Sequence, residues 1–377
     1  MNIRFLEKNR INLISLEFPP IRGGAGVYCD ELSTAASEIG FPVTLWVPQG
    51  SKTLSTGMQI NELPFRGSQG WACSLRLILF LRHRLNAHSF VHLAEPAALL
   101  AFIRFGWLIR QPLKFIITIH GSELRRFGKI IPEKFFFRQI IKNAEAIHVL
   151  SLFNQKSLLA RFPFLEKNKV HRVPGAPARA ITKEADVKRK NVNKKQSMIL
   201  CVGRIHPRKG QLELLDAIEQ FSLEHKSKLT CHFVGPFTHW NYYEKVKERA
   251  RSSGCAVLFH GDQQDSELLK FYQSADIFAL TPILQPKSVE GFGFVYLEAS
   301  FHGLPIIGHK VGGVEDAVKN GETGFLIDPS NKQGLSSALQ SLIEDEELRR
   351  SLGEKGREWA ANHSWQKVAT KIYAVSG

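Results

Sequence analysis

The most specific spacing of reactive residues lies in 288–300, where Glu290 and Glu298 stand eight positions apart around Gly291 and Gly293. If both carboxylates sit on one helix, about 12 Å of helix axis separates them, too far for a single acid/base pair. They can instead hold opposite ends of an elongated ligand, with phosphates between them on the backbone N–H groups that glycines leave accessible. The alternative is that Glu298 is an ordinary exposed helix residue and that Glu290 is a first-turn carboxylate favoured by the helix dipole.

A second candidate is the segment 203–210, which contains Arg204 and Lys209 between an expected strand and an expected helix over 211–221. Arginine offers a planar fork of donors and lysine a compact cation, so the pair suits a diphosphate. The alternative is a solvated basic turn.

A third candidate is the glycine-rich segment 19–28, with Gly23 and Gly24 between the first expected strand and helix. It is not a nicotinamide-dinucleotide fingerprint, because Cys29 stands where the third glycine belongs and no acidic residue follows about 20 positions later. The remaining readings are an anion site at a helix N-terminus or a tight turn without a ligand.

Short apolar, β-branched runs alternate with amphipathic stretches in both halves of the chain, which predicts parallel sheets flanked by helices. The expected strands are 11–16, 43–47, 90–93, 115–119, 146–150 and 170–173, then 198–202, 229–234, 257–259, 277–280 and 305–307. The expected helices include 26–39, 74–86, 133–144, 335–344, 347–362 and 365–374.

The polar stretch 182–197 holds six Lys/Arg and few apolar residues, so it reads as a linker. The chain is therefore predicted to be α/β, with two doubly wound, Rossmann-like domains over 1–181 and 198–362 that face each other across a cleft. Ligand would bind at the carboxyl ends of both sets of strands. The last segment, 363–377, is an expected helix that can cross back to the first domain.

Composition excludes several classes of protein. The 377 residues are 44% hydrophobic and 23% charged, values of a folded globular protein rather than a disordered or fibrous one. No apolar run approaches the roughly 18 residues of a membrane span, and residues 1–10 lack a signal-peptide core. The five cysteines are scattered, which argues against a disulfide framework or a zinc site and for a reducing cytoplasm.

The net charge of +15 is unevenly distributed, with +17 in residues 1–200 and −2 in residues 201–377. Any partner attracted by this excess is negatively charged and meets the first half. Nucleic acid, anionic lipid and an acidic small substrate all fit that description.

Taken together, these motifs resemble glycosyltransferase family 4, the retaining sugar transferases of the GT-B architecture, over nearly the whole chain. The glycine loop at 23–26, the Gly-Arg-x₄-Lys-Gly at 203–210 and the Glu-x₇-Glu at 290–298 occur in the family's order and spacing. The segments 312–315 and 321–326 match as well. Within the family, residues 290–300 and 120–123 look most similar to bacterial phosphatidylinositol-mannoside mannosyltransferases.

The resemblance implies a role for each motif. Arg204 and Lys209 would bind the donor diphosphate, Glu298 the ribose, and Glu290 hydroxyls of the transferred sugar, while His120 would point at that sugar. The alternative for His120 is a core histidine satisfied by backbone. The expected catalytic residues are His120, Arg204, Lys209 and Glu290. The expected donor-binding residues are Gly23, Gly24, Arg204, Lys209, Gly261, Gln263, Glu290, Gly291, Phe292, Gly293, Phe294, Val295 and Glu298.

The sequence also departs from the family pattern. Residues 173–177 read Val-Pro-Gly-Ala-Pro, where the family usually has Pro-Asn-Gly-Val-Asp, so hinge contacts cannot be carried over. There is no Asp-x-Asp and no recognised metal-ligand spacing. We therefore expect no metal and no cofactor beyond a GDP- or UDP-sugar as co-substrate.

The expected function is metal-independent, retaining transfer of a hexose, with mannose favoured, to a lipid-linked or glycan acceptor in envelope glycolipid or polysaccharide synthesis. Alternatives are a sugar-nucleotide epimerase, a phosphorylase, an inactive scaffold and a nucleic-acid-binding protein, the last of which leaves the paired glutamates unexplained. The expected location is the cytoplasm, at the inner face of the membrane.

Residues 71–138 are the expected contact with an anionic membrane, since basic and large apolar residues interleave there. The alternative is that the aromatics fill a core. The basic residues concerned are Arg76, Arg82, Arg84, Arg104, Arg110, Arg125, Arg126, Lys129, Lys134 and Arg138. The apolar ones are Trp71, Leu79, Phe80, Trp107, Phe127, Ile130, Ile131 and 135–137.

Overall fold

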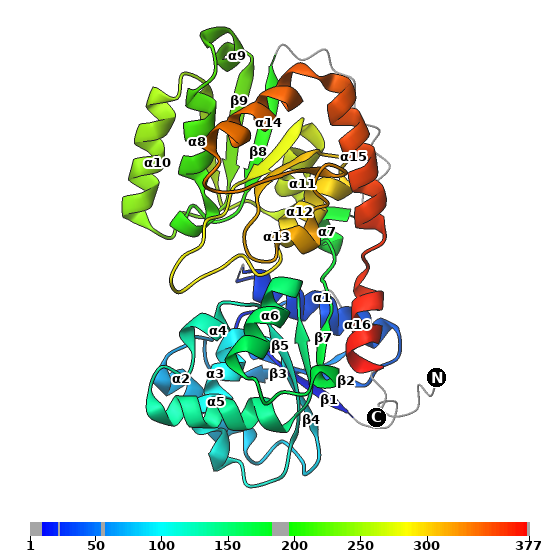
Figure 1. Ribbon diagram of the computed structural model, residues 1–377. Helices are drawn as coiled ribbons and strands as arrows, with labels where there is room; N and C mark the ends of the chain where they lie inside the picture. Colours follow the sequence, from blue (N-terminus) through cyan, green and yellow to red (C-terminus); the bar gives the residue numbers. More distant parts are fainter. Residues whose placement is uncertain (1–9, 22, 54–56, 183–195, 375–377) are drawn as a thin grey trace. The chain divides into compact units, whose positions relative to one another are not determined.

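The computed structural model describes residues 10–21, 23–53, 57–182 and 196–374 (Figure 1). The described chain forms two compact α/β units, so the expected fold class is confirmed. The first unit comprises residues up to 175 together with those from 364 onward, and the second comprises 176–363. Nearly all of the expected linker 182–197, and Arg22 of the glycine-rich segment, lie outside the described residues.

The first unit is built on a seven-stranded parallel sheet in the order β3-β2-β1-β4-β5-β6-β7. Its strands are β1 (Ile11–Ile14), β2 (Val43–Pro48), β3 (Gln59–Leu63), β4 (Phe90–Leu93), β5 (Lys114–Ile119), β6 (Ala144–Val149) and β7 (Val170–Arg172). β1, β2 and β4 are buried along their whole length, as expected of central parallel strands covered on both faces.

The helices of this unit flank the sheet. They are α1 (Gly24–Glu38), α2 (Trp71–Leu81), α3 (Pro96–Phe105), η2 (Gly106–Leu108), α4 (Glu123–Arg126), α5 (Ile131–Asn143), α6 (Leu152–Arg161), η3 (Lys167–Lys169) and α16 (Trp365–Tyr373). The C-terminal helix α16 packs on α1, where the Trp365 and Tyr28 rings meet edge to face at 5.5 Å and Gln366 donates to Glu38. Phe127 and Phe137, expected at a membrane surface, are instead buried in the core beneath α5.

The second unit is built on a six-stranded parallel sheet in the order β10-β9-β8-β11-β12-β13. Its strands are β8 (Ser197–Val202), β9 (Leu229–Val234), β10 (Ala256–Gly261), β11 (Ile277–Leu280), β12 (Ile306–His309) and β13 (Gly324–Ile327). Its helices are α7 (Arg179–Thr182), η4 (Pro207–Lys209), α8 (Gln211–Glu219), α9 (Leu223–Ser227), α10 (Trp240–Ser252), α11 (Asp265–Ser274), α12 (Phe294–Phe301), α13 (Val314–Ala317), α14 (Lys332–Glu344) and α15 (Glu346–Ala361).

Two features differ from the sequence-based expectation. The strands β3 and β13 were not among the expected ones, and each forms an edge of its sheet. In addition, α12 begins at Phe294, so Glu290 precedes the helix rather than sharing it with Glu298. Across the described ranges, no helix is both long and apolar enough to cross a bilayer.

Candidate functional site

The centre of the candidate site is a buried ion cluster in the second unit. Lys209 Nζ donates to Glu290 Oε2 at 2.8 Å, and Arg208 Nη1 donates to the same oxygen at 2.5 Å. Both partners of the lysine–glutamate pair are at most 9% exposed. A carboxylate that is out of water and shared by two cations is held in one position, which is what recognition of a substrate hydroxyl requires.

The charges in this cluster fix its protonation state. Burial alone would raise the pKa of Glu290, but Arg208 and Lys209 outweigh burial and lower the pKa to about 2. Burial lowers the pKa of Lys209 from its usual range, with Glu290 acting against that shift. Glu290 is therefore a carboxylate throughout the physiological range and accepts hydrogen bonds without donating any.

Arg208 and Lys209 are positioned by the short turn η4 after β8. His206 caps this turn, since its Nδ1 accepts from Arg208 N at 3.1 Å. Burial, with the nearby cations, lowers the pKa of His206 to about 4, so its ring is neutral and Nδ1 is free to accept. Gly210 then takes a positive φ of 72°, and a Cβ there would lie 1.6 Å from Thr281 O. Only glycine allows the chain to turn from η4 into α8 at this point.

The backbone of Glu290 is fixed by the glycine pair that follows β12. Gly313 N donates to Glu290 O at 2.8 Å, and Gly312 has a φ of 64°. A Cβ on Gly312 would come within 2.2 Å of Glu290 O. The Gly312–Gly313 motif seen in the sequence thus supports the Glu290 loop.

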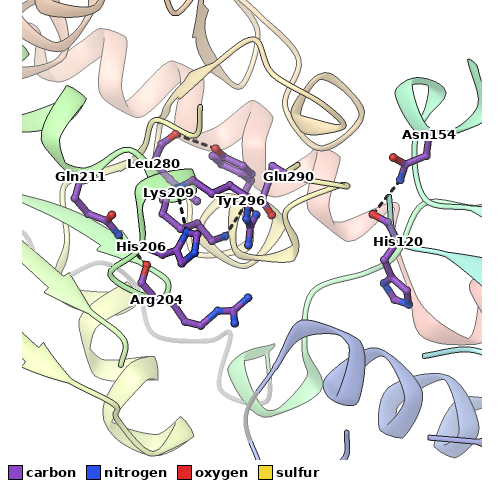
Figure 2. A network of polar contacts seen from close by, with 10 residues as sticks. His120, Asn154, Arg204, His206, Lys209, Gln211, Leu280, Glu290 and Tyr296 are labelled. Carbon is purple, nitrogen blue, oxygen red and sulfur yellow. Dashed lines mark hydrogen bonds and ion pairs between the residues drawn. The ribbon is translucent and has the colours of Figure 1, made fainter. Parts of the chain in front are cut away.

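The expected phosphate-binding backbone lies at the start of α12. Gly293 is its N-cap with a φ of 91°, and a Cβ there would contact the Tyr296 ring. Phe292 is buried, whereas Gly291, Phe294 and Val295 are partly accessible. Tyr296 is anchored by its hydroxyl on Leu280 O at 2.8 Å, shown in Figure 2. The helix start is thus rigidly held and partly open.

Glu298 lies one turn into α12 and apart from the ion cluster. The hydroxyl of Tyr272 in α11 donates a hydrogen bond to Glu298 Oε2 at 2.7 Å. Glu298 is only 7% exposed. Burial raises the pKa of Glu298 to about 7, although the Tyr272 hydrogen bond opposes the shift. The two glutamates therefore differ in charge state, one fixed as an anion and the other near its titration point.

Arg204 is exposed. Burial is the main cause that lowers the pKa of Lys209, and the charge of Arg204 adds to that shift. The backbone of Arg204 is fixed because Gln211 Nε2 donates to Arg204 O at 3.0 Å. Gly261 ends β10 with a φ of 66° and open space where a Cβ would be, and Gln263 donates back to His260 O. The structure places these residues on the loops that follow β8 and β10.

His120 belongs to the first unit, directly after β5. Its Nε2 donates to Ala94 O at 2.8 Å. Asn154 Nδ2 donates to His120 O, as Figure 2 shows. Glu123 accepts from His120 N at 2.9 Å. One ring nitrogen is thus satisfied by backbone, as in the alternative reading of this residue, while the ring is only partly buried.

At the glycine loop of the first unit, the structure shows an internal carboxylate. Glu17 Oε1 accepts from Gly26 N at 3.1 Å, and a Cβ on Gly23 would lie 1.9 Å from the same oxygen. A Cβ on Gly24 would meet no atom within 4 Å. The N-terminus of α1 therefore already has an anion at Gly26, and Gly24 is the open position of the loop.

Sequence reasoning did not include Arg208 or Glu17 among the site residues. Arg208 stands inside the basic motif beside Lys209, so its sequence position was a usable signal. Glu17 had no comparable signal, because a single carboxylate before a glycine loop is common. Within the described ranges, no group of three or more His, Cys, Asp or Glu residues is placed to hold a metal ion.

Two protein-family models match the chain in succession. The model described as Glycosyltransferase Family 4 matches residues 22–176, and the model described as Glycosyl transferases group 1 matches residues 182–359. The two matches correspond to the two units and leave only short segments uncovered.

The chain is also similar in sequence to proteins that are named as glycosyltransferases. A D-inositol 3-phosphate glycosyltransferase of Corynebacterium diphtheriae is 34% identical over 181 residues, which is 47% of this chain and 41% of that protein. The chain thus matches less than half the length of that relative. A GDP-mannose-dependent alpha-(1-6)-phosphatidylinositol monomannoside mannosyltransferase of Mycobacterium tuberculosis is 24% identical over 97% of both chains.

Solved structures share the fold. Sucrose-phosphate synthase from Thermosynechococcus elongatus superposes with a TM-score of 0.76 at 19% identity over 97% of each chain. HepE from Anabaena, in a complex with UDP and glucose, superposes with a TM-score of 0.74 at 17% identity over 96% of this chain and 97% of that one. With both units matched by family models and the architecture shared with GT-B enzymes, this chain belongs to glycosyltransferase family 4 and is a glycosyltransferase that uses nucleotide sugars.

Proposed function

We propose that this enzyme transfers a hexose, with mannose favoured, from a GDP- or UDP-sugar to a lipid-linked or glycan acceptor in envelope glycolipid or polysaccharide synthesis. The anomeric configuration is retained and no metal ion takes part. The observation that carries the proposal is the buried Lys209–Glu290 pair, which presents a cation and a permanent anion side by side. The names of the mannosyltransferase and inositol phosphate relatives support the choice of sugar and acceptor.

In this proposal the diphosphate is bound by Arg204 and Lys209, whose charges stabilise the negative charge that builds up on the departing nucleotide. Glu290 accepts hydrogen bonds from hydroxyls of the transferred sugar, and Arg208 keeps it ionised when Lys209 turns to the phosphate. No protein nucleophile is assigned. The acceptor attacks the face that the nucleotide leaves, assisted by the leaving phosphate, and His120 faces the sugar.

The remaining donor contacts follow the shape of a nucleotide sugar. Glu298 accepts from the ribose hydroxyls, and the backbone of residues 291–295 receives the phosphates and sugar. Gly261 and Gln263 contact the base. Gly23 and Gly24 approach the donor from the first unit, where Gly24 has the space to do so.

The acceptor side is proposed to lie on a surface of the first unit around Arg104, here called the Arg104 surface. Arg104 stacks on Trp71 at 4.2 Å, pairs with Glu133 of α5 at 2.8 Å, and its carbonyl accepts from Trp107. These contacts join α2, η2 and α5 in one patch. Its exposed apolar side chains are Trp71 (51%), Trp107 (59%), Ile130 (47%), Ile131 (86%) and Phe135 (55%).

Exposed basic residues lie on these elements or next to them in the chain. They are Arg76, Arg110, Arg126, Lys129, Lys134 and Arg138. Large apolar groups with a basic rim suit the interface between water and anionic lipid, where each cation contributes about 1 kcal/mol. We propose that this surface binds the inner face of the membrane and that nucleic acid is not a partner.

The proposal is tested by a thermal-shift screen against UDP-, GDP-, ADP- and TDP-sugars, followed by product analysis. The cognate donor should raise the melting temperature, because a ligand that binds only the native state stabilises it. With that donor and membrane lipid extract, label should appear in lipid or glycan. Release of an isomerised sugar without an acceptor would instead indicate an epimerase.

A further inference from the structure

The first unit contains a polar cavity that the proposed reaction does not use. Its volume is about 280 Å³, below the roughly 300–1,000 Å³ of drug-sized ligand pockets and large enough for a small molecule. The lining residues are Arg10, Asn12, Thr44, Trp46, Gln59, Asn61, Arg84, Asn86 and Ser89. The lining side chains carry amide, hydroxyl and guanidinium groups and one aromatic ring, and none of them is a carboxylate. The chemistry of this lining suits a polar anion.

This cavity lies at the amino ends of the strands. Arg10 immediately precedes β1, Gln59 begins β3, and Ser89 immediately precedes β4. Glu17 and His120, by contrast, follow the carboxyl ends of β1 and β5. About seven residues separate Arg10 from Glu17, which corresponds to roughly 20 Å of extended chain. The cavity is therefore separate from the glycine loop that Glu17 contacts.

Two guanidinium groups supply its positive charge. Arg84 is held over the Phe80 ring at 3.8 Å, and its Nη1 donates to Phe80 O at 2.7 Å. Arg10 Nη1 donates to Gln59 Oε1 at 2.5 Å. Each guanidinium has five N–H donors, so these contacts orient the groups and leave most donors for a ligand. Neither arginine forms an ion pair with a described carboxylate.

Two lining residues are fixed by hydrogen bonds of their side chains. Trp46 Nε1 donates to Asn12 Oδ1 at 3.0 Å, and Asn12 Nδ2 donates to Phe90 O. Both side chains are therefore held in place at the wall of the cavity.

We propose that this cavity binds a small phosphate ester of a polyhydroxyl compound, such as a hexose phosphate, at a site distinct from the donor site. The Arg10 and Arg84 forks match phosphate oxygens, and the amides of Asn61 and Asn86 match hydroxyls. The inference does not depend on the identity of the donor or the acceptor.

The test is calorimetric titration of the full chain with glucose 6-phosphate, with glucose as the uncharged comparison. Arg84→Ala should weaken binding by about tenfold or more, the loss expected for a charge-assisted phosphate contact. Arg82→Ala is the matched control, because Arg82 is an exposed neighbour that does not line the cavity. Glucose should bind at least tenfold more weakly than its phosphate.

A second comparison separates this cavity from the donor site, which also binds phosphates. If glucose 6-phosphate enters the cavity, Arg204→Ala should leave its affinity unchanged. Loss with Arg204→Ala but not with Arg84→Ala, or no heat at millimolar probe, would overturn the proposal.

Discussion

Lys209 Nζ and Glu290 Oε2 lie 2.8 Å apart although 81 positions separate the two residues in the chain. The pair joins the turn after β8 to the loop before α12, both at the carboxyl edge of the second sheet. Because the pair is buried and Arg208 shares the same oxygen, a bound diphosphate can draw on Lys209 while Glu290 keeps a cationic neighbour. The predictions below follow from this arrangement.

Substitution of Glu290 and substitution of Glu298 should impair the binding of different ligands. Glu298→Gln should weaken binding of the free nucleoside diphosphate, because the ribose loses a carboxylate acceptor. Glu290→Gln should leave that binding nearly intact and impair the complete sugar donor. Titrating each variant with both ligands measures the difference.

Glu315→Gln is the control for this comparison, because Glu315 is a half-exposed glutamate paired with Lys310. It should bind both ligands normally. Equal loss of nucleoside diphosphate binding in the Glu290 and Glu298 variants would contradict the division of roles.

The two donor-site cations should differ in their effect on stability. Each of Arg204→Ala and Lys209→Met should cost roughly 2–4 kcal/mol of transition-state stabilisation, measured as kcat/KM with the cognate donor. A solvated basic turn was the alternative for this segment in the sequence, but Lys209 is only 9% exposed. Lys209→Met should therefore also lower the free energy of unfolding by roughly 1–3 kcal/mol, whereas Arg204→Ala should not.

Denaturant titration of the two variants checks that asymmetry. Full activity of either variant would refute the assignment of that residue to the diphosphate. An equal loss of stability in both variants would contradict the prediction that the buried lysine contributes more to stability than the exposed arginine.

Stability should depend on pH through Glu298. Its pKa in the folded protein is raised to about 7 from an ordinary 4.5. A raised carboxyl pKa stabilises the fold fully below pH 4.5, and this contribution is lost as pH rises toward 7. The melting-temperature advantage of wild type over Glu298→Gln should thus be larger at pH 5 than at pH 8. A difference independent of pH would show that Glu298 does not titrate in this range.

Membrane binding should follow the Arg104 surface. The wild-type chain should sediment with anionic liposomes at low salt and be released as salt screens the basic rim. Arg126→Glu/Lys129→Glu should abolish sedimentation without changing donor binding. The control is Lys245→Glu/Lys355→Glu, two exposed lysines of the second unit. Absence of sedimentation by wild type at low salt would favour a soluble acceptor.

Most of the fold follows from sequence pattern because central parallel strands are continuously apolar. β11, for example, spans the expected residues 277–280 and is buried throughout. The strands β3 and β13 were not predicted because neither has a long continuous apolar run bounded by turn residues. β3 reads Gln-Ile-Asn-Glu-Leu, with most of its residues exposed, and β13 is only four residues long and starts at a glycine.

The site was less predictable than the fold. Spacing alone identified Glu290 and Glu298, but not that α12 begins at Phe294 and leaves Glu290 on a loop. That start depends on Gly293 adopting a positive φ, which a glycine permits but does not require. The pairing of Glu290 with Arg208 and Lys209 is a long-range contact, so no local pattern encodes it.

The central claim, retaining transfer from a nucleotide sugar without a metal, is tested most directly by proton NMR of the product formed with the cognate donor in EDTA. The account predicts undiminished product with the anomeric configuration of the donor, together with loss of that product in Glu290→Gln. An inverted anomeric centre, or activity that disappears on chelation and returns with a divalent ion, would contradict it.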